Sequence, residues 1–327
     1  MRELYFSHAL REALEEEMER DERVVLMGED IAEYGGAFKI TADFVRRFGP
    51  ERVRNTPISE AGFVGVAIGA AMTGLRPVVE IMFMDFITLA MDQLINHAAK
   101  FRYMYHGQVS VPLVVRAPAG AGRRYGPTHS QSLERHFVAT PGLLVVAPAT
   151  PADAKGLLKA AIRCDDPVIF VESKILYGRR GEVPEGDYVT PLGRARVARQ
   201  GADVTIVAWS RMVEEALRAA DALADHGVQA EVIDVRTLAP LDMPAIANSV
   251  RKTGRVVVVE EGPLAGGVGA EIVSRIAAEC FYELSAPPRR VAAVDVPVPA
   301  SPVLEDAVTP DAHRIAKAVA ELMAEGG

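Results

Sequence analysis

The chain has 327 residues and a formal net charge of −8, with 49% hydrophobic and 24% charged residues. This composition is typical of a soluble globular protein with room for two domains of about 100–200 residues each. Because the Lys and Arg residues are scattered, no nucleic acid partner is expected.

No membrane partner is expected either. The longest apolar stretch, from about Ala61 to Leu75, is shorter than the ~20 residues that a membrane-spanning helix needs. The chain begins with an acidic helical pattern in place of a signal peptide. Its two cysteines, Cys164 and Cys280, make neither a metal cluster nor a disulfide framework, and they fit two buried thiols in a cytoplasmic protein.

Apolar strand patterns alternate with helical patterns along the first half of the chain. The pattern predicts helices over residues 7–20, 41–49, 85–103 and 150–164, the last capped by Thr150 or Asp153, and a further helix in the stretch that begins at Thr56. It predicts strands over 24–28, 77–83, 111–118, 143–148 and 167–173. Strands separated by helices of this length indicate a mainly parallel sheet covered on both faces.

Residues 177–193 are rich in Gly, Pro and charge and are predicted to be a linker. The alternation then resumes, with strands over 203–210, 229–235, 255–261 and 289–296, helices over 213–226, 243–252 and 311–324, and a helix opened by GGVGAEI at residue 266. The sequence therefore predicts two doubly wound α/β domains, residues 1–185 and 186–327.

Glu60 is the most unusual residue of the first domain. It opens the segment EAGFVGVAIGAAM, in which small or apolar residues recur every third or fourth position, the spacing of a buried helix face. A lone ionised carboxylate costs several kcal/mol in such a place unless something hydrogen-bonds it. Glu60 therefore either caps its helix or awaits a partner that the chain does not supply.

Two further segments are candidates for a site. GPLAGGVGAEI, residues 262–272, follows a strand, but its spacing is not that of a dinucleotide-binding loop, which favours a tight turn that lets the backbone pack closely. His129 lies in the Gly-rich loop AGAGRRYGPTHSQS between two strands, where open α/β sheets place active sites. On pattern alone, a surface loop histidine is the favoured interpretation of His129.

The stretch TPISEAGFVGVAIGAAMTGLRPVVEI, beginning at Thr56, resembles the cofactor-binding segment of the β subunits of thiamine-diphosphate-dependent 2-oxo acid dehydrogenases. The resemblance continues through MDQLINHAAKFRYMYHGQ, VPLVVRAPAGAG, THSQS, DDPVIFVESKILY and DVRTLAPLD, in order and over nearly the whole chain. It implies a transketolase-like fold, with a pyrimidine-binding domain followed by a C-terminal transketolase domain.

The resemblance implies roles for five residues. Glu60 would hydrogen-bond the pyrimidine ring of thiamine diphosphate, Phe86 would stack on that ring, and Ile58 and Met82 would contact its edge. His129 would lie near the thiazolium ring and donate a proton during acyl transfer to lipoamide. Ordinary core packing is the alternative for Ile58, Met82 and Phe86.

Many members of that family hold a structural potassium ion through backbone carbonyls. The matching positions here are Leu113, Ala161, Ile162, Cys164 and Asp166. Cys164 stands where an acidic residue is frequent and Asp166 where Asn is frequent, but carbonyl ligation tolerates such changes and Asp166 supplies a hard oxygen. A plain helix C-terminus is the alternative.

The chain lacks the GDG and NN motifs with which the family binds the magnesium diphosphate. The resemblance therefore implies that an α subunit holds the magnesium, in an α2β2 heterotetramer where a second β chain pairs through the C-terminal domain. Carboxylates of that domain, such as Asp295, would dock a basic binding domain of the lipoyl acyltransferase core, although a solvated strand end is the favoured explanation of Asp295.

The expected activity is decarboxylation of a 2-oxo acid, either pyruvate or a branched-chain one, with transfer of the acyl group to a lipoyl arm. Three alternatives remain: an acetoin dehydrogenase β subunit, a split transketolase-like enzyme with Arg123 and Arg124 near a sugar phosphate, or a non-catalytic scaffold. Retention of Glu60, Phe86 and His129 together argues against the scaffold.

Overall fold

The computed structural model describes residues 1–325, and the chain divides into two compact units. The first unit contains residues 1–119 and 136–192, and the second contains residues 120–135 and those from 193 onward. The sequence places the domain boundary between residues 185 and 186, whereas the packing of the first unit continues to Leu192.

The first unit is built on a parallel sheet. Its strands follow the order β6-β7-β5-β4-β2-β3, and all neighbours are parallel. The runs VVLMG in β2 and VIFVES in β7 are buried along their whole length, as expected for strands covered on both faces. The helical and strand segments are β1 (Arg2–Tyr5), α1 (Phe6–Arg20), β2 (Val24–Gly28), α2 (Phe44–Phe48), β3 (Val53–Asn55), α3 (Glu60–Met72), β4 (Arg76–Glu80), η1 (Met84–Ala90), η2 (Gln93–Ala98), α4 (Ala99–Met104), β5 (Val114–Ala119), α5 (Glu134–Val138), β6 (Leu144–Val146), α6 (Pro151–Arg163), β7 (Val168–Ser173), η3 (Leu176–Gly178) and β8 (Arg180–Val183).

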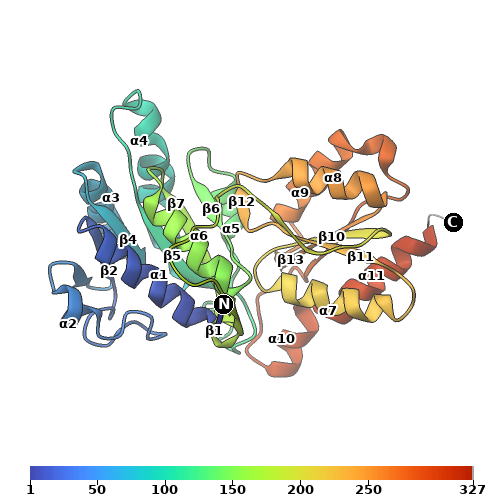
Figure 1. Ribbon diagram of the computed structural model, residues 1–327, viewed down its shortest axis with the longest axis horizontal. Helices are drawn as coiled ribbons and strands as arrows, with labels where there is room; N and C mark the ends of the chain where they lie inside the picture. Colours follow the sequence, from blue (N-terminus) through green and yellow to red (C-terminus); the bar gives the residue numbers. More distant parts are fainter. Residues whose placement is uncertain (326–327) are drawn as a thin grey trace. The chain divides into compact units, whose positions relative to one another are not determined.

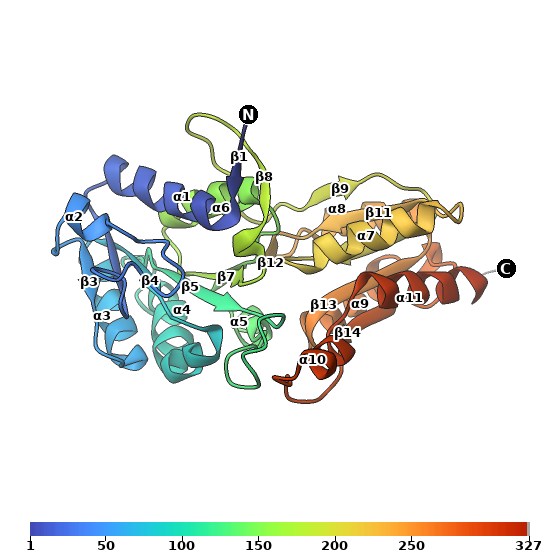
Figure 2. The same cartoon turned by 90° about the horizontal axis from the view of Figure 1, so that it is seen from below.

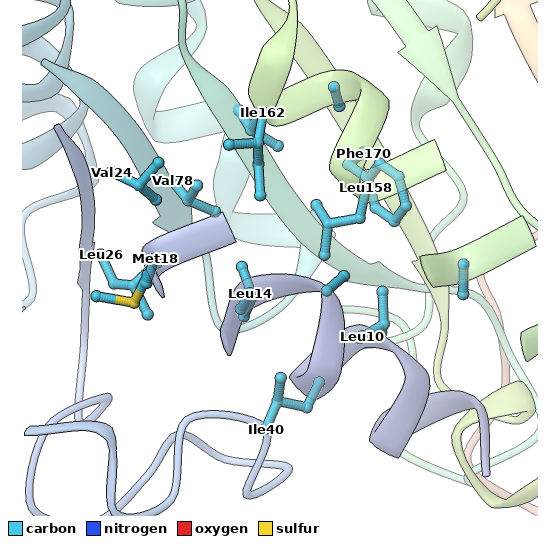
Figure 3. Close-up of a cluster of buried hydrophobic side chains, with 14 of the residues drawn as sticks. Leu10, Leu14, Met18, Val24, Leu26, Ile40, Val78, Leu158, Ile162 and Phe170 are labelled. Atoms are coloured by element: carbon cyan, nitrogen blue, oxygen red, sulfur yellow. The ribbon is translucent and has the colours of Figure 1, made fainter. Parts of the chain in front are cut away.

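Helices cover both faces of this sheet. Figure 2 shows α1 and α6 on one side of the strands and α3 and α4 on the other. The close-up in Figure 3 shows the core on the α1 side, where α1 and α6 meet the strands. Leu10, Leu14 and Met18 recur every fourth residue of α1, so that one stripe of the helix is buried, and each such side chain stabilises the fold by about 1.5–3 kcal/mol.

Helix α6 begins as the sequence predicts. The Thr150 hydroxyl accepts a hydrogen bond from the Asp153 backbone N–H at 3.1 Å, and Pro151 occupies the first helical position. Thr150 is therefore the cap.

The predicted segment 85–103 is helical throughout, but not as a single α-helix. The chain instead forms the 3₁₀ segment η1, the π segment η2 and the short helix α4. Both η1 and η2 pack against α3, and Gln93 of η2 lies against Gly65 of α3. Tertiary packing against α3 therefore overrides the local α-helical pattern.

The predicted linker over 177–193 is also partly structured. Strand β8 within it pairs antiparallel with β1, with Arg2 opposite Val183 and Tyr5 opposite Arg180. The polar composition of both strands hides this pairing from a hydrophobic pattern.

The second unit has a sheet of order β14-β13-β10-β11-β9, in which β9 is antiparallel to β11 and the other neighbours are parallel. Figure 1 shows α8 and α9 on one face of this sheet and α7 and α11 on the other. Its segments are β9 (Arg196–Arg199), β10 (Val204–Ala208), α7 (Met212–Ala224), β11 (Ala230–Asp234), β12 (Thr237–Ala239), α8 (Met243–Thr253), β13 (Val256–Pro263), α9 (Val268–Glu279), η4 (Phe281–Glu283), β14 (Arg289–Ala293), α10 (Pro302–Val308) and α11 (Ala312–Glu325).

The predicted class of two doubly wound, mainly parallel α/β domains is confirmed. Among residues 1–325, no helix combines the length and the apolar character required to cross a membrane. Both cysteines are free thiols: Cys280 is buried, Cys164 is half-buried, and burial raises the pKa of each thiol.

Candidate active site

Glu60 occupies the first turn of α3, next to the carboxyl ends of β2 and β3. Its side chain is only 5% exposed, in a helix whose other buried residues are apolar. The N-terminus of a helix favours a carboxylate because its backbone N–H groups are unpaired there. Open α/β sheets bind ligands at the carboxyl ends of their strands, so Glu60 lies where such a site is expected.

A second carboxyl group, Glu29, lies beside Glu60 and was missed from the sequence. It directly follows β2, and burial first, then the charges of Glu60 and Asp30, raise its pKa. Two acidic side chains therefore lie at this corner of the sheet, Glu60 buried and Glu29 half-buried. Its position immediately after the apolar strand VVLMG is the sequence signal that could have found it.

Two polar atoms at this edge of the sheet are buried without a hydrogen-bond partner within the described part of the chain: Glu29 Oε1 and Thr56 Oγ1. The Thr56 backbone N–H donates to Gly28 O at 3.0 Å, so both atoms belong to the same corner of the first unit. A buried polar atom is normally paired. This corner therefore fits a ligand that carries its own donors and acceptors, as an aminopyrimidine ring does.

The three residues expected to contact the pyrimidine ring differ in how far they are exposed to solvent. Phe86 in η1 and Met82 just after β4 are half-buried, whereas Ile58 is 84% exposed. The Phe86 ring packs edge-on against Phe83, with ring centroids 6.3 Å apart. Phe86 and Met82 are thus partly fixed by the first unit, and Ile58 presents an apolar side chain to solvent.

A buried ion-pair network supports the strand that leads to Met82 and Phe86. Arg116 of β5 donates to Glu80 Oε2 at 2.6 Å and makes a two-pronged pair with Glu172 of β7, at 2.7 and 2.9 Å. The Tyr177 hydroxyl donates to Glu172 Oε2 at 2.6 Å. Because these four groups satisfy one another, the charges are tolerated inside the protein, and they join β4, β5 and β7.

Aromatic side chains connect this network to Phe86. The Tyr177 ring meets Phe38 at 4.9 Å, Phe38 meets Phe83 at 6.0 Å, and Phe83 meets Phe86. The ammonium group of Lys174 lies 5.5 Å from the centroid of the Phe83 ring. The predicted stacking residue, Phe86, therefore belongs to a packed row of aromatic side chains.

His129 belongs to the second unit, on the segment 120–135, and is half-buried. Its Nδ1 lies 3.0 Å from the Thr128 hydroxyl, and its backbone N–H donates to Gly126 O at 3.4 Å. If the Thr128 hydroxyl donates, Nδ1 is an acceptor and Nε2 carries the proton.

The five predicted potassium ligands lie near the turn between α6 and β7. Leu113 O accepts from Val168 N–H at 2.8 Å and Ala161 O accepts from Cys164 N–H at 3.2 Å, which leaves each carbonyl one free lone pair. Ile162 is in the last turn of α6. The Asp166 carboxylate forms an ion pair with Arg102, so that its side chain is already engaged. Within residues 1–325 no group of His, Cys, Asp and Glu side chains could hold a metal, and the potassium site stays a prediction based on carbonyls.

The glycine-rich turn before α9 packs closely, as the sequence favours. A Cβ at Gly267 would lie 2.3 Å from Glu260 Oε2, and the Gly269 N–H donates to the same oxygen at 3.2 Å. Glu260 thus covers the start of α9.

Comparison with known proteins identifies the class to which this fold and site belong. The transketolase pyrimidine-binding domain family matches residues 2–180, and the transketolase C-terminal domain family matches residues 193–315. The chain therefore belongs to the transketolase-like family of 2-oxo acid dehydrogenase β subunits.

Similar proteins include the pyruvate dehydrogenase E1 component subunit beta-2 of Oryza sativa, which is 48% identical over 97% of this chain and 85% of its own. The acetoin:2,6-dichlorophenolindophenol oxidoreductase subunit beta of Cupriavidus necator is 46% identical over 99% of both chains. Among solved structures, an inactive β4 tetramer of a split-gene transketolase matches with a TM-score of 0.81 and 27% identity over 99% of each chain.

Proposed function

We propose that this chain is the β subunit of an α2β2 thiamine-diphosphate-dependent dehydrogenase component that decarboxylates a 2-oxo acid and passes the acyl group to a lipoyl arm. The buried Glu60 at the start of α3, beside Glu29 and two unpartnered polar atoms, carries the proposal. The relatives named pyruvate dehydrogenase E1 β subunits support pyruvate as the substrate, with branched-chain 2-oxo acids as the other choice.

When bound, thiamine diphosphate would supply a carbanion that adds to the 2-oxo carbon and accepts the electron pair released with CO₂. Glu60 would hydrogen-bond a ring nitrogen through a carboxylate oxygen and take part in proton transfer there. Phe86 would stack on the ring and Met82 would contact its edge, with Ile58 reaching the ring from its exposed loop. Glu29 would keep the corner acidic and orient Glu60.

His129 would act later, as the proton donor when the acyl group passes to lipoamide. The α subunit would hold the magnesium and the diphosphate, since this sequence lacks GDG and NN. The proposal includes a structural potassium ion at the carbonyls near α6 and docking of the lipoyl acyltransferase core on the second unit. It also includes a cytoplasmic location. Asp295, the suggested docking residue, accepts the Ala265 backbone N–H at 3.0 Å.

A second candidate is the β subunit of an acetoin-cleaving enzyme. It is favoured by two acetoin:2,6-dichlorophenolindophenol oxidoreductase β subunits, from Cupriavidus necator and Bacillus subtilis, which are 45–46% identical to the chain over 99% of its length. The same Glu60 chemistry would serve it, because acetoin cleavage also needs a carbanion at the cofactor.

The test is calorimetric titration of thiamine diphosphate and Mg²⁺ into the β chain, the α chain and their mixture. The mixture is then assayed with pyruvate, branched-chain 2-oxo acids and acetoin. Binding is expected only in the mixture, and the substrate turned over names the enzyme.

Glu60→Gln is expected to lower decarboxylation at least ~100-fold, in keeping with loss of a positioned acid–base group. Glu51→Gln is the matched control, since Glu51 pairs with Arg54 on the surface of the same unit. Tight binding to β alone, or activity indifferent to Glu60, would contradict the proposal.

A further inference from the structure

The segment 120–135, called here the His129 loop, lies between two strands of the first unit in sequence but packs with the second unit. Its conformation is unusual for L residues, since Arg124 has φ 63° and both Gly120 and Gly122 have positive φ. Such a backbone persists only when the surrounding structure holds it. The groups that hold it are carboxylates from two elements of the second unit.

Glu261 of β13 is the first anchor. Its Oε1 accepts the Ala121 backbone N–H at 2.8 Å and also the Arg211 guanidinium at 3.4 Å. The carboxylate lies directly over Gly120, where a Cβ would be 2.9–3.1 Å from its atoms. Gly120 therefore provides both the positive φ and the space that this contact needs.

Glu305 of α10 is the second anchor, and its side chain is 1% exposed. One oxygen accepts the Gly122 N–H at 2.8 Å and the other accepts the Arg124 guanidinium at 2.6 Å. Arg124 also pairs with Asp306 at 2.8 and 3.1 Å. A carboxylate that accepts from an amide and a guanidinium makes stronger hydrogen bonds than a neutral group.

Two successive amides of the loop are thus bound by carboxylates from two different elements. At the other end of the loop, the Trp209 indole N–H donates to Glu134 Oε1 at 3.3 Å. His129 lies between these fixed ends. The carboxylates do not need to touch a substrate to control where the imidazole stands.

We infer that Glu261 and Glu305 are positioning residues that hold the His129 loop in the geometry required for acyl transfer. The inference rests on the proposed function of His129. Arg124 then helps to attach the loop to α10 through Glu305 and Asp306. These ion pairs explain the presence of Arg124 without a sugar phosphate. A displacement of about 1 Å at a reacting group can cost on the order of 100-fold in rate, so loosening one anchor has a measurable effect.

The experiment uses the α2β2 enzyme reconstituted with Glu261→Gln or Glu305→Gln β chains. Gln keeps the size of the side chain and removes the charge that binds Arg211 or Arg124. Glu279→Gln is the matched control, because Glu279 forms a surface ion pair with Arg275 in the same unit. Each enzyme is assayed for dye-coupled decarboxylation and for acyl transfer to an isolated lipoyl domain.

The readout is the ratio of the two rates, which general damage to the fold would leave unchanged. Both anchor variants are expected to lower the ratio about tenfold, with Glu279→Gln within about twofold of wild type. In a His129→Gln background, Glu305→Gln is expected to add less than about twofold, because the two residues act through one group.

A spectroscopic readout does not depend on turnover. Trp209 is the single tryptophan of the chain, so a 5-fluorotryptophan-labelled β chain reconstituted with unlabelled α gives one ¹⁹F signal beside Glu134. Glu305→Gln is expected to broaden or shift it, and Glu279→Gln to leave it in place.

The possible failures are distinguishable. If His129→Gln lowers the transfer ratio but neither anchor variant does, or if their effects multiply, the positioning role is wrong and the proposed function stands. If His129→Gln leaves the ratio unchanged, the proposed role of His129 is wrong and the positioning role falls with it.

Discussion

At the scale of single residues, buried carboxyl groups dominate the chemistry of both units. Burial raises the pKa of Glu29 and of Glu80. The negative charge of Glu60 raises the pKa of Glu29 further, whereas the positive charge of Arg116 opposes the rise at Glu80. Removing one member of a buried ion pair typically costs about 3–5 kcal/mol, so Arg116 is a structural requirement of the first unit.

Glu134 gives a residue-scale prediction about pH. Burial, with the nearby charges of Glu261 and Glu260 adding to it, raises its pKa to about 7, although the Trp209 indole N–H donates to it. The folded chain therefore binds this proton more tightly than the unfolded chain, whose Glu has a pKa of about 4.3. Its stabilising contribution is complete below pH ~4.3 and is lost as the pH rises through ~7.

Glu134→Gln, which keeps an oxygen for Trp209, is expected to be more stable than wild type above pH ~7 by up to roughly 3 kcal/mol and equal to it near pH 4. Urea unfolding of the chain between pH 5 and 8.5 measures the difference. Wild-type Trp209 fluorescence should also titrate with a midpoint near 7 and cease to do so in the variant. A difference in stability that does not change with pH would contradict the shifted pKa.

At the scale of elements, apolar runs predict the central strands because strands covered on both faces are composed mainly of apolar residues. The short pair β1 and β8 and the short helices α5 and α10 lack such a signal. The 3₁₀ and π geometry of η1 and η2 depends on packing against α3, which a local pattern cannot contain.

The residues of the candidate site divide in the same way, into those with a local sequence signal and those that only tertiary packing brings together. The sequence indicates Glu60 because a charge stands at the start of an apolar helix face. Glu261 and Glu305 are far from His129 in sequence, and only the fold brings them to its loop. Contacts between distant segments are therefore what the sequence alone does not reveal.

Glycine contacts give an element-scale prediction. A Cβ at Gly28, the last residue of β2, would lie 2.6 Å from the Glu80 backbone oxygen, whereas one at Gly69 in α3 would meet nothing within 4 Å. Gly28→Ala is expected to destabilise the chain by about 1–3 kcal/mol through overpacking between β2 and β4. Gly69→Ala is expected to stabilise it by up to about 1 kcal/mol through helix propensity.

Thermal and urea unfolding of the two variants alone measures both effects. Similar stabilities for Gly28→Ala and wild type would mean that β2 and β4 are less closely packed than described.

At the scale of the whole molecule, the first unit exposes apolar side chains along α3 and its approach. Ile58, Val66, Met72 and Leu75, on α3 or next to it in sequence, are each more than a third exposed. Exposed apolar residues that gather on one element mark interaction sites.

The chain alone is therefore expected to self-associate in a concentration-dependent manner and to form a defined assembly when the α chain is added. Sedimentation of β alone, and of β with α, measures this. Val66→Asp is expected to weaken assembly with α, and Val189→Asp, at an exposed valine outside α3, serves as the control. A β chain that remains monomeric at all concentrations and ignores α would contradict the shared-site proposal.

The chain passes between the two units at three points: residues 119/120, 135/136 and 192/193. A genetic exchange at the third point would transplant the second unit without the segment that Glu261 and Glu305 bind. The carboxylates of the transplanted unit would then face the 120–135 segment of the other parent protein, whose amide and guanidinium groups need not lie in the matching positions. A chimaera that keeps the contacts between these carboxylates and the His129 loop therefore needs three junctions in place of one.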